Sequence, residues 1–143
     1  MEIARQAGLQ LDVTRQLNLP YAHVWLAQRA AEGEVLGFAI AHRLADEFEL
    51  IDIVTLPGAR RQGVGSALIQ RLVEVGCDLD LCAMYLEVRS RNLPAIRLYE
   101  KHGFTKTHTR PNYYQAPSDD ALCMRRPLAL RLSPRGELRK LGH

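Results

Sequence analysis

The chain has 143 residues, of which 47% are hydrophobic and 24% charged, a composition typical of one globular domain with a buried core. No apolar run approaches the ~18 residues of a membrane span, and the opening residues lack the apolar core of a secretion signal, so we expect a cytoplasmic protein. The net charge is +3, but six basic residues and one acidic residue lie from Arg125 onward, and the rest of the chain carries −2. The basicity therefore belongs to the end of the chain, and the domain is not expected to bind nucleic acid directly.

The first half of the chain predicts short helices followed by an antiparallel meander. Apolar residues recur at helical spacing over the first 20 residues, so one or two short helices are expected there, ending before Pro20. Apolar runs separated by turn residues then predict three strands, at 21–27, 35–42 and 48–56. The short turns between them favour antiparallel pairing.

The middle of the chain predicts a strand–helix–strand unit. An apolar stripe with a period of three to four residues predicts a helix from Gly63 to about Gly76. A further apolar strand is expected at 84–89. Because a helix and not a hairpin joins this strand to the one before, the two strands should pair in parallel through a right-handed crossover.

A second helix is predicted from an N-cap at Asn92 to a left-handed C-cap at Gly103, and strands at 104–108 and 121–125 follow, joined by a polar loop. The fold class is therefore α/β, with a mixed sheet that is antiparallel at its ends and parallel in the middle. We expect one domain over residues 1–126 and a basic tail over 127–143. A disordered, solvated tail is favoured over one that contacts a nucleic acid or an acidic partner.

The stretch around Gly63 and Gly65 has the features of an anion-binding loop. An apolar strand ends at Pro57, two arginines follow, and the glycines open a helix. Glycines allow a ligand to approach the backbone, and the first N–H groups of a helix point at an anion such as phosphate or pyrophosphate. A simple turn with solvated arginines is the alternative.

Two side chains could perform acid–base chemistry. Glu87 lies among apolar neighbours in its strand, where burial would suit a carboxylate to take a proton from an ammonium group; the alternative is a solvated position on an alternating strand. Tyr99 lies in the next helix and could donate a proton to a leaving thiolate, or could simply be a core aromatic.

Other polar or reactive side chains are less telling. Asn92 could only cap its helix, and Arg110 with Tyr113 and Tyr114 could form a binding edge or only pack. The three cysteines form no Cys-x-x-Cys pair and are expected to be small buried hydrophobes. Five histidines are scattered without ligand spacing, so no metal site is expected.

Two motifs resemble the GNAT family of N-acetyltransferases. Arg60-x-x-Gly63-x-Gly65 is similar to the family's acetyl-CoA pyrophosphate loop. The segment from Leu86-Glu87-Val88-Arg89 to Gly103-Phe104, with Asn112-Tyr113-Tyr114, resembles the RimI-type branch, whose members acetylate the N-terminal alanine of a small-subunit ribosomal protein. The similarity extends over about residues 21–126.

The resemblance implies a function and a site. The chain would be an acetyl-CoA-dependent N-acetyltransferase whose amine substrate attacks the thioester directly, without an acyl-enzyme or a metal. Glu87 would accept a proton, through water, and Tyr99 would protonate the CoA thiolate. The splayed strand that binds the pantetheine arm would be Ile53, Val54 and Thr55. The remaining acetyl-CoA contacts would be Arg61, Gln62, Gly63, Val64, Gly65, Ser66 and Asn92.

The resemblance leaves alternatives open. We expect the family's first strand and part of its first helix to be missing, because only about 20 residues precede Tyr21. These elements help to form the acceptor site, so the acceptor could instead be a small amine or a lysine side chain. A non-catalytic acetyl-CoA-binding module is the alternative from another class, and a nucleic-acid binder acting through the tail is a further, weaker one.

Overall fold

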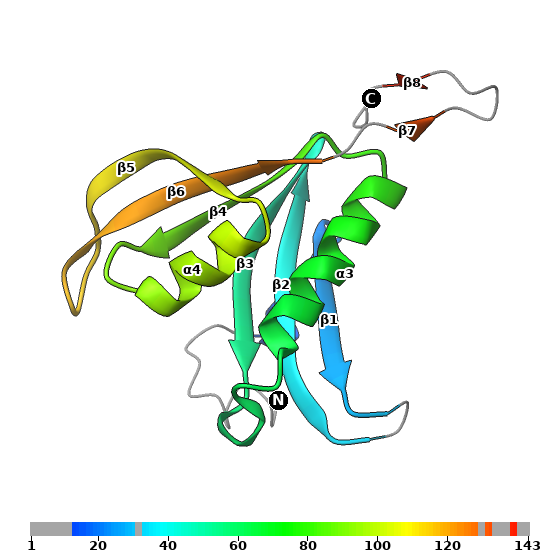
Figure 1. Ribbon diagram of the computed structural model, residues 1–143, viewed down its shortest axis with the longest axis horizontal. Coiled ribbons are helices and arrows are strands. Elements are labelled where there is room, and N and C mark those ends of the chain that lie inside the picture. Colours follow the sequence, from blue (N-terminus) through cyan, green and yellow to red (C-terminus); the bar gives the residue numbers. More distant parts are fainter. Residues whose placement is uncertain (1–12, 31–32, 129–130, 133–137, 140–143) are drawn as a thin grey trace.

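The computed structural model describes residues 13–30, 33–128, 131–132 and 138–139 (Figure 1). A single turn of 3-10 helix, Pro57–Ala59, precedes the second helix of this part of the chain. The helices and strands are α2 Val13–Leu17, β1 Ala22–Gln28, β2 Val35–Leu44, β3 Glu47–Thr55, α3 Val64–Asp78, β4 Ala83–Arg89, α4 Leu93–Lys101, β5 Thr105–Tyr114, β6 Asp119–Pro127, β7 Arg131–Leu132 and β8 Leu138–Arg139. None of the helices described is both long and apolar enough to cross a membrane.

In the described part of the chain, six strands form one mixed sheet in the order β1-β2-β3-β4-β6-β5. β3 and β4 pair in parallel, and every other neighbouring pair is antiparallel. Figure 1 shows α3 and α4 on the same side of this sheet. The predicted fold class is therefore confirmed, together with the meander and the parallel crossover.

The main core lies between these two helices and the sheet. Leu68, Ile69 and Leu72 of α3 are buried against Phe48 of β3 and Leu86 of β4. Leu68 and Leu72 belong to the apolar stripe that predicted the helix, so the burial of this stripe against the sheet stabilises α3 in this position. The opposite face carries a much smaller cluster, built on Phe38 and Ile40.

β3 and β4 diverge part of the way along their length. Their parallel pairing runs only from Glu47 opposite Ala83 to Leu50 opposite Leu86, although both strands continue beyond it. On the other side of β3, the pairing with β2 shifts by one residue at this level and leaves Ile51 without a counterpart. Such a bulge bends a strand, and here it accompanies the opening of the sheet.

β5 is longer than predicted. The strand runs to Tyr114 and pairs with β6 as far as Tyr114 opposite Asp119, whereas residues 109–114 were predicted to be loop. All of its residues except the half-buried Tyr114 are exposed, so no apolar alternation marks this edge strand. An edge position also accommodates Pro111, which has no N–H to donate.

The predictions for the two ends of the chain can be compared with the structure only in part. Val13–Leu17 is the described part of the predicted N-terminal helices, and the rest of that prediction, with the missing first strand, lies outside the described residues. At the other end, Leu128 is buried in the main core, and its N–H donates to the carbonyl of Cys82. β7 and β8 then pair as a short antiparallel ribbon, where the sequence favoured disorder.

Candidate active site

A cavity of about 470 Å³ occupies the opening between β3 and β4. Its wall is formed by the diverging ends of these strands, by the beginning of α3 and by one face of α4. Six of the expected catalytic and acetyl-CoA-binding residues line it: Ile53, Thr55, Gly65, Glu87, Asn92 and Tyr99. The proposed base, the proposed acid and part of the expected cofactor strand therefore meet in one space.

A smaller cavity of about 190 Å³ adjoins it at the glycine loop. The two share Thr55, Gly65 and Leu98 in their walls, so together they form a continuous groove. Most of the predicted loop lines the smaller one: Arg60, Arg61, Gly63, Val64, Gly65 and Ser66.

The loop is shaped for the approach of an anion. Gly63 caps α3 with a φ of 75°, a left-handed conformation that glycine adopts without steric cost. The free N–H groups that follow point out of the helix start, where the helix dipole favours negative charge. At Gly65 a Cβ atom would lie 3.0 Å from Cδ2 of Leu98, so α3 and α4 approach each other closely at the mouth of the groove.

Two of the expected acetyl-CoA contacts have side chains that point away from the groove, although the contact expected of Val54 is through its backbone. Val54 packs on the opposite face of the sheet with Phe38 and Ile40. The amide of Gln62 donates to the carbonyl of Gly58 at 3.4 Å and accepts from Arg29 at 3.3 Å. The sequence pattern did not separate these two positions from their neighbours because both belong to the same contiguous motif.

Glu87 lies where two cavities meet. Besides the main cavity, it lines a cavity of about 410 Å³ on the opposite side, together with Glu49, Tyr85, Arg110 and Tyr113. The Glu87 side chain is only 14% exposed, so the solvated position that alternation allowed does not occur. Its Oε1 accepts a hydrogen bond from the hydroxyl of Tyr85 at 2.8 Å.

Tyr99 is buried at the other wall of the main cavity. Its ring packs edge-on against Phe104, with the centroids 5.8 Å apart. Burial is the main cause that raises the pKa of Tyr99 well above its usual range, and the charges of Asp52 and Tyr114 add to it. The phenol therefore stays protonated at neutral pH and is available as a proton donor.

Asn92 has the local role that its sequence position predicts. Its Oδ1 accepts a hydrogen bond from the N–H of Ala95 at 3.3 Å, which caps α4. Because the residue also lines the main cavity, capping and ligand contact are compatible here.

The sequence analysis missed Asp52 and did not place Tyr114 in this cavity, although both line it. Burial raises the pKa of Asp52, and a hydrogen bond from the N–H of Ile53 at 2.9 Å works against that shift. The signal for Asp52 was present, since it is the one carboxylate in the apolar run 50–56, as Glu87 is in its own strand. Burial, followed by the charge of Glu87, raises the pKa of Tyr114 to about 12.

Among the described residues, no group of three or more His, Cys, Asp or Glu side chains is arranged to hold a metal ion. Cys123 is buried, and Cys77 and Cys82 are partly buried; all three are free thiols. None of them lines the main cavity.

Comparison with known proteins points to one family. The sequence model of the acetyltransferase (GNAT) family matches residues 2–104. The [ribosomal protein bS18]-alanine N-acetyltransferase of Escherichia coli strain K12 is 35% identical over 105 residues, which cover 72% of this chain and 71% of that protein. The putative enzyme of the same name from Bacillus subtilis is 33% identical over 108 residues, covering 76% and 70%.

The solved structures agree with the sequences. The crystal structure of the ribosomal-protein-S18-alanine N-acetyltransferase from Escherichia coli superposes with a TM-score of 0.80 at 29% identity, covering 91% of this chain and 86% of that one. The structure of Ard1 from Thermoplasma volcanium has a TM-score of 0.64 at 34% identity, covering 68% and 66%.

Proposed function

This chain belongs to the acetyltransferase (GNAT) family and is an acetyl-CoA-dependent N-acetyltransferase, and we propose that its acceptor is the N-terminal amine of a ribosomal protein that begins with alanine. The proposal places it in the cytoplasm, with residues 1–126 as the catalytic domain and 127–143 as a basic tail. The observation that carries the catalytic assignment is the meeting of Glu87 and Tyr99 in one cavity that continues into the glycine loop.

In this proposal the groove binds acetyl-CoA along its length. The N–H groups at the start of α3 and the guanidinium of Arg61 hold the pyrophosphate. The exposed edge of β3 at Ile53, Val54 and Thr55 binds the pantetheine arm through its backbone, since β4 has diverged and leaves that edge unpaired. Gln62, through its backbone, with Gly63, Val64, Gly65, Ser66 and Asn92, completes the cofactor contacts.

The reaction is a direct transfer. Glu87 takes a proton from the acceptor's ammonium group, through water, and the neutral amine attacks the thioester carbonyl. The new N–C bond forms as the C–S bond breaks, and Tyr99 gives its proton to the departing thiolate. The nitrogen then loses its second proton to water, and Tyr99 is protonated again from water. Because both substrates are held in one cleft, much of the acceleration comes from orientation. Proton transfer by positioned groups typically contributes about 10²–10⁴-fold.

The acceptor reaches Glu87 from the cavity on the opposite side of the sheet. The position of Glu87 in both walls supports this route, because an amine entering there would meet the carboxylate before the thioester. The ribosomal acceptor is supported by the relatives from Escherichia coli and Bacillus subtilis, whose names state that activity.

The test is the release of CoA from acetyl-CoA in the presence of a peptide that begins with alanine and copies the N-terminus of protein bS18. A peptide of the same sequence with its N-terminus already blocked is the control. Turnover with the free amine alone supports the proposal. Turnover with small amines or with a lysine side chain, but not with the peptide, would show a different acceptor.

Two variants test the residue roles in the same assay. We expect Glu87→Gln and Tyr99→Phe each to lower kcat by about 10²-fold or more while acetyl-CoA still binds. If both variants kept the full rate, the catalytic assignment would fail. Binding of acetyl-CoA without turnover of any amine, in the unaltered protein, would instead identify a binding module.

A further inference from the structure

Arg110 contacts the proposed base from two strands away. Glu87 lies on β4, and its partner across the pair is Cys123 on β6; Arg110 lies on β5, opposite Ala121 of β6. Cys123 and Ala121 are both completely buried and have short side chains. The long side chain of Arg110 can therefore cross β6 to the level of Glu87.

The guanidinium lies within reach of three groups around the cavity. Its Nη2 is 3.7 Å from Oε1 of Glu87, and it donates to the hydroxyl of Tyr85 at 3.5 Å. Its central carbon lies 5.8 Å from the centre of the Tyr113 ring, a cation–π distance. The Tyr85 hydroxyl is itself bonded to Glu87, so guanidinium, phenol and carboxylate form one connected group.

The backbone that carries Arg110 is fixed to the strand that carries Glu87. Asn112 has a φ of 51°, and its N–H donates to Oδ1 of Asp120 at 2.8 Å. The neighbouring Asp119 accepts from the hydroxyl of Ser90 at 2.6 Å and from the N–H of Arg91 at 3.2 Å, directly beyond the end of β4. The hairpin of β5 and β6 is thus hydrogen-bonded to the residues that follow β4. These bonds fix the backbone that carries Arg110 relative to Glu87.

The two partners differ in their freedom. The side chain of Arg110 is 49% exposed, whereas that of Glu87 is 14% exposed. Among the ion pairs of the residues that the structure describes, Glu87 takes part in this one only. A carboxylate with so little access to water is stabilised by a nearby cation more than a solvated one is.

We infer that Arg110 is a positioning residue for the transfer: it holds the carboxylate of Glu87 at the junction of the two cavities. The inference rests on the proposed role of Glu87 as the base. Arg110 itself touches neither reacting atom.

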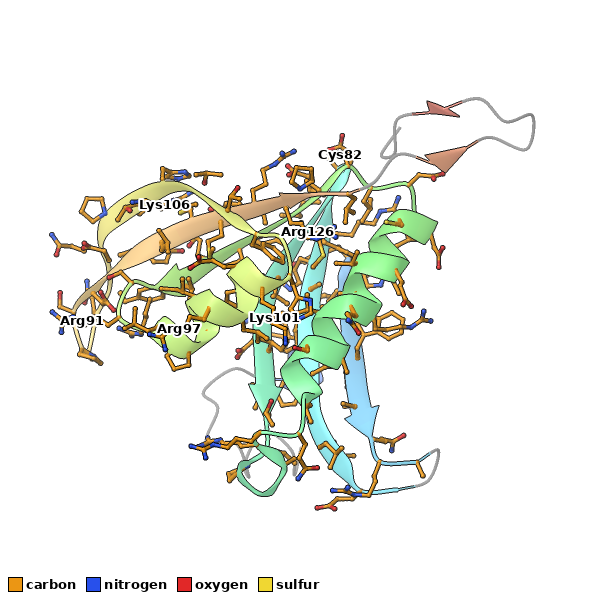
Figure 2. All side chains as sticks on the ribbon, in the orientation of Figure 1. Cys82, Arg91, Arg97, Lys101, Lys106 and Arg126 are labelled. Carbon is orange, nitrogen blue, oxygen red and sulfur yellow. The ribbon has the colours of Figure 1, made fainter. Side chains whose placement is uncertain are left out.

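The experiment compares Arg110→Gln, Arg110→Lys and the matched control Arg97→Gln. Arg97 is an exposed cation on α4 that lines neither cavity (Figure 2). We expect Arg110→Gln to lower kcat about tenfold with the KM for acetyl-CoA unchanged, since a hydrogen bond or ion pair to a charged group is worth about that much. Arg110→Lys should recover most of the loss, and Arg97→Gln should match the unaltered enzyme.

In the decisive experiment, Arg110→Gln is introduced into the Glu87→Gln variant. The single-turnover rates of the double variant and of Glu87→Gln alone are then compared. If Arg110 acts through Glu87, its loss has no further effect there. An equal penalty in both backgrounds, or a change in the KM for acetyl-CoA alone, would overturn the inference. This result does not depend on which amine is the acceptor. If another amine proves to be the substrate, the double-mutant cycle of Arg110→Gln and Glu87→Gln is measured with that amine. The coupling between the two substitutions still decides the role of Arg110.

Discussion

The two faces of the sheet differ in the kind of side chains that they bury. Under α3 and α4 the described residues form one continuous apolar cluster that includes Phe48, Leu72 and Leu86. On the opposite face the buried apolar cluster is reduced to Phe38 and Ile40, and beside it lies the polar group around Glu87. Burial on the helix-covered face stabilises the fold. The opposite face can carry polar side chains because the strands are already held in place by that burial.

The main cavity lies at the boundary between these faces. It exists because β3 and β4 separate beyond Leu50 and Leu86, which are the last paired residues and belong to the helix-side core. The same residues therefore end the core and begin the site. A substitution in the core of the helix-covered face should therefore lower the free energy of unfolding. A substitution at the boundary should instead lower the rate of acetyl transfer.

The largest expected effect is the loss of a core side chain on the helix-covered face. Leu72→Ala removes a completely buried side chain of α3 and should cost about 2–5 kcal/mol, because the cavity it leaves cannot fully collapse. Leu93→Ala on α4, where the side chain is 52% exposed, should cost less than about 0.5 kcal/mol. Urea unfolding measures both, and equal costs would contradict the assignment of stability to this face.

At the boundary, Tyr99→Phe should separate chemistry from stability. The ring keeps its edge contact with Phe104, so the free energy of unfolding should change by less than about 1 kcal/mol. The loss of the phenol should lower kcat by about 10²-fold if it is the proton donor. The two quantities are measured on the same preparation, by urea unfolding and by CoA release, and a fall in both together would assign Tyr99 to the core instead.

The two faces of the sheet also differ in how well the sequence predicted them. The helix-covered face was predictable because its parts are contiguous: the glycine loop, α3 and β4 each carry a local period or motif. Glu87 and Tyr99 lie only twelve positions apart, on a strand and the helix that follows it, so that local order was enough to suggest a common cleft.

The other face was predictable only in part. Arg110 and Tyr113 could be named as a possible binding edge, but their contacts are assembled from distant segments. Arg110 meets Tyr85 and Glu87 only after β5 has paired with β6 and β6 with β4. The exposed pattern of β5 gave no period from which its length could be predicted. Asp52 was missed for a different reason: its charge was visible, but only the divergence of the strands reveals that it lines a cavity.

A smaller effect is expected at the glycine loop. Gly63→Ala places a Cβ in a left-handed conformation, at a cost of about 1–2 kcal/mol, with no neighbour within 4 Å to clash. Relaxation of the loop should raise the KM for acetyl-CoA up to about tenfold with little change in kcat. Gly58→Ala is the matched control, since it is equally open and does not have this backbone conformation, and an equal rise in KM there would argue against a role for the loop geometry.

The smallest effect is expected at Asp52. Because burial raises the pKa of this carboxyl in the folded state, its contribution to stability is present at acid pH and is lost as the pH rises through the folded pKa. Asp52→Asn removes the charge but keeps an oxygen that can accept the hydrogen bond from Ile53. Tm should therefore rise by about 2–4 °C at neutral pH, and the gain should vanish below about pH 4.

The same variant should also alter catalysis, with a sign fixed by the structure. The charge of Asp52 helps to raise the pKa of Tyr99, so its removal lowers that pKa, and an alkaline limb of the rate profile that reports Tyr99 should move to lower pH. Glu34→Gln, in an exposed ion pair with Arg29 at 3.8 Å, should change neither Tm nor the profile measurably. A rise in Tm without a moved limb would leave Asp52 as a strained core carboxylate and would separate it from Tyr99, whereas both shifts together would show that burial at the boundary between the two faces acts on stability and chemistry through the same charge.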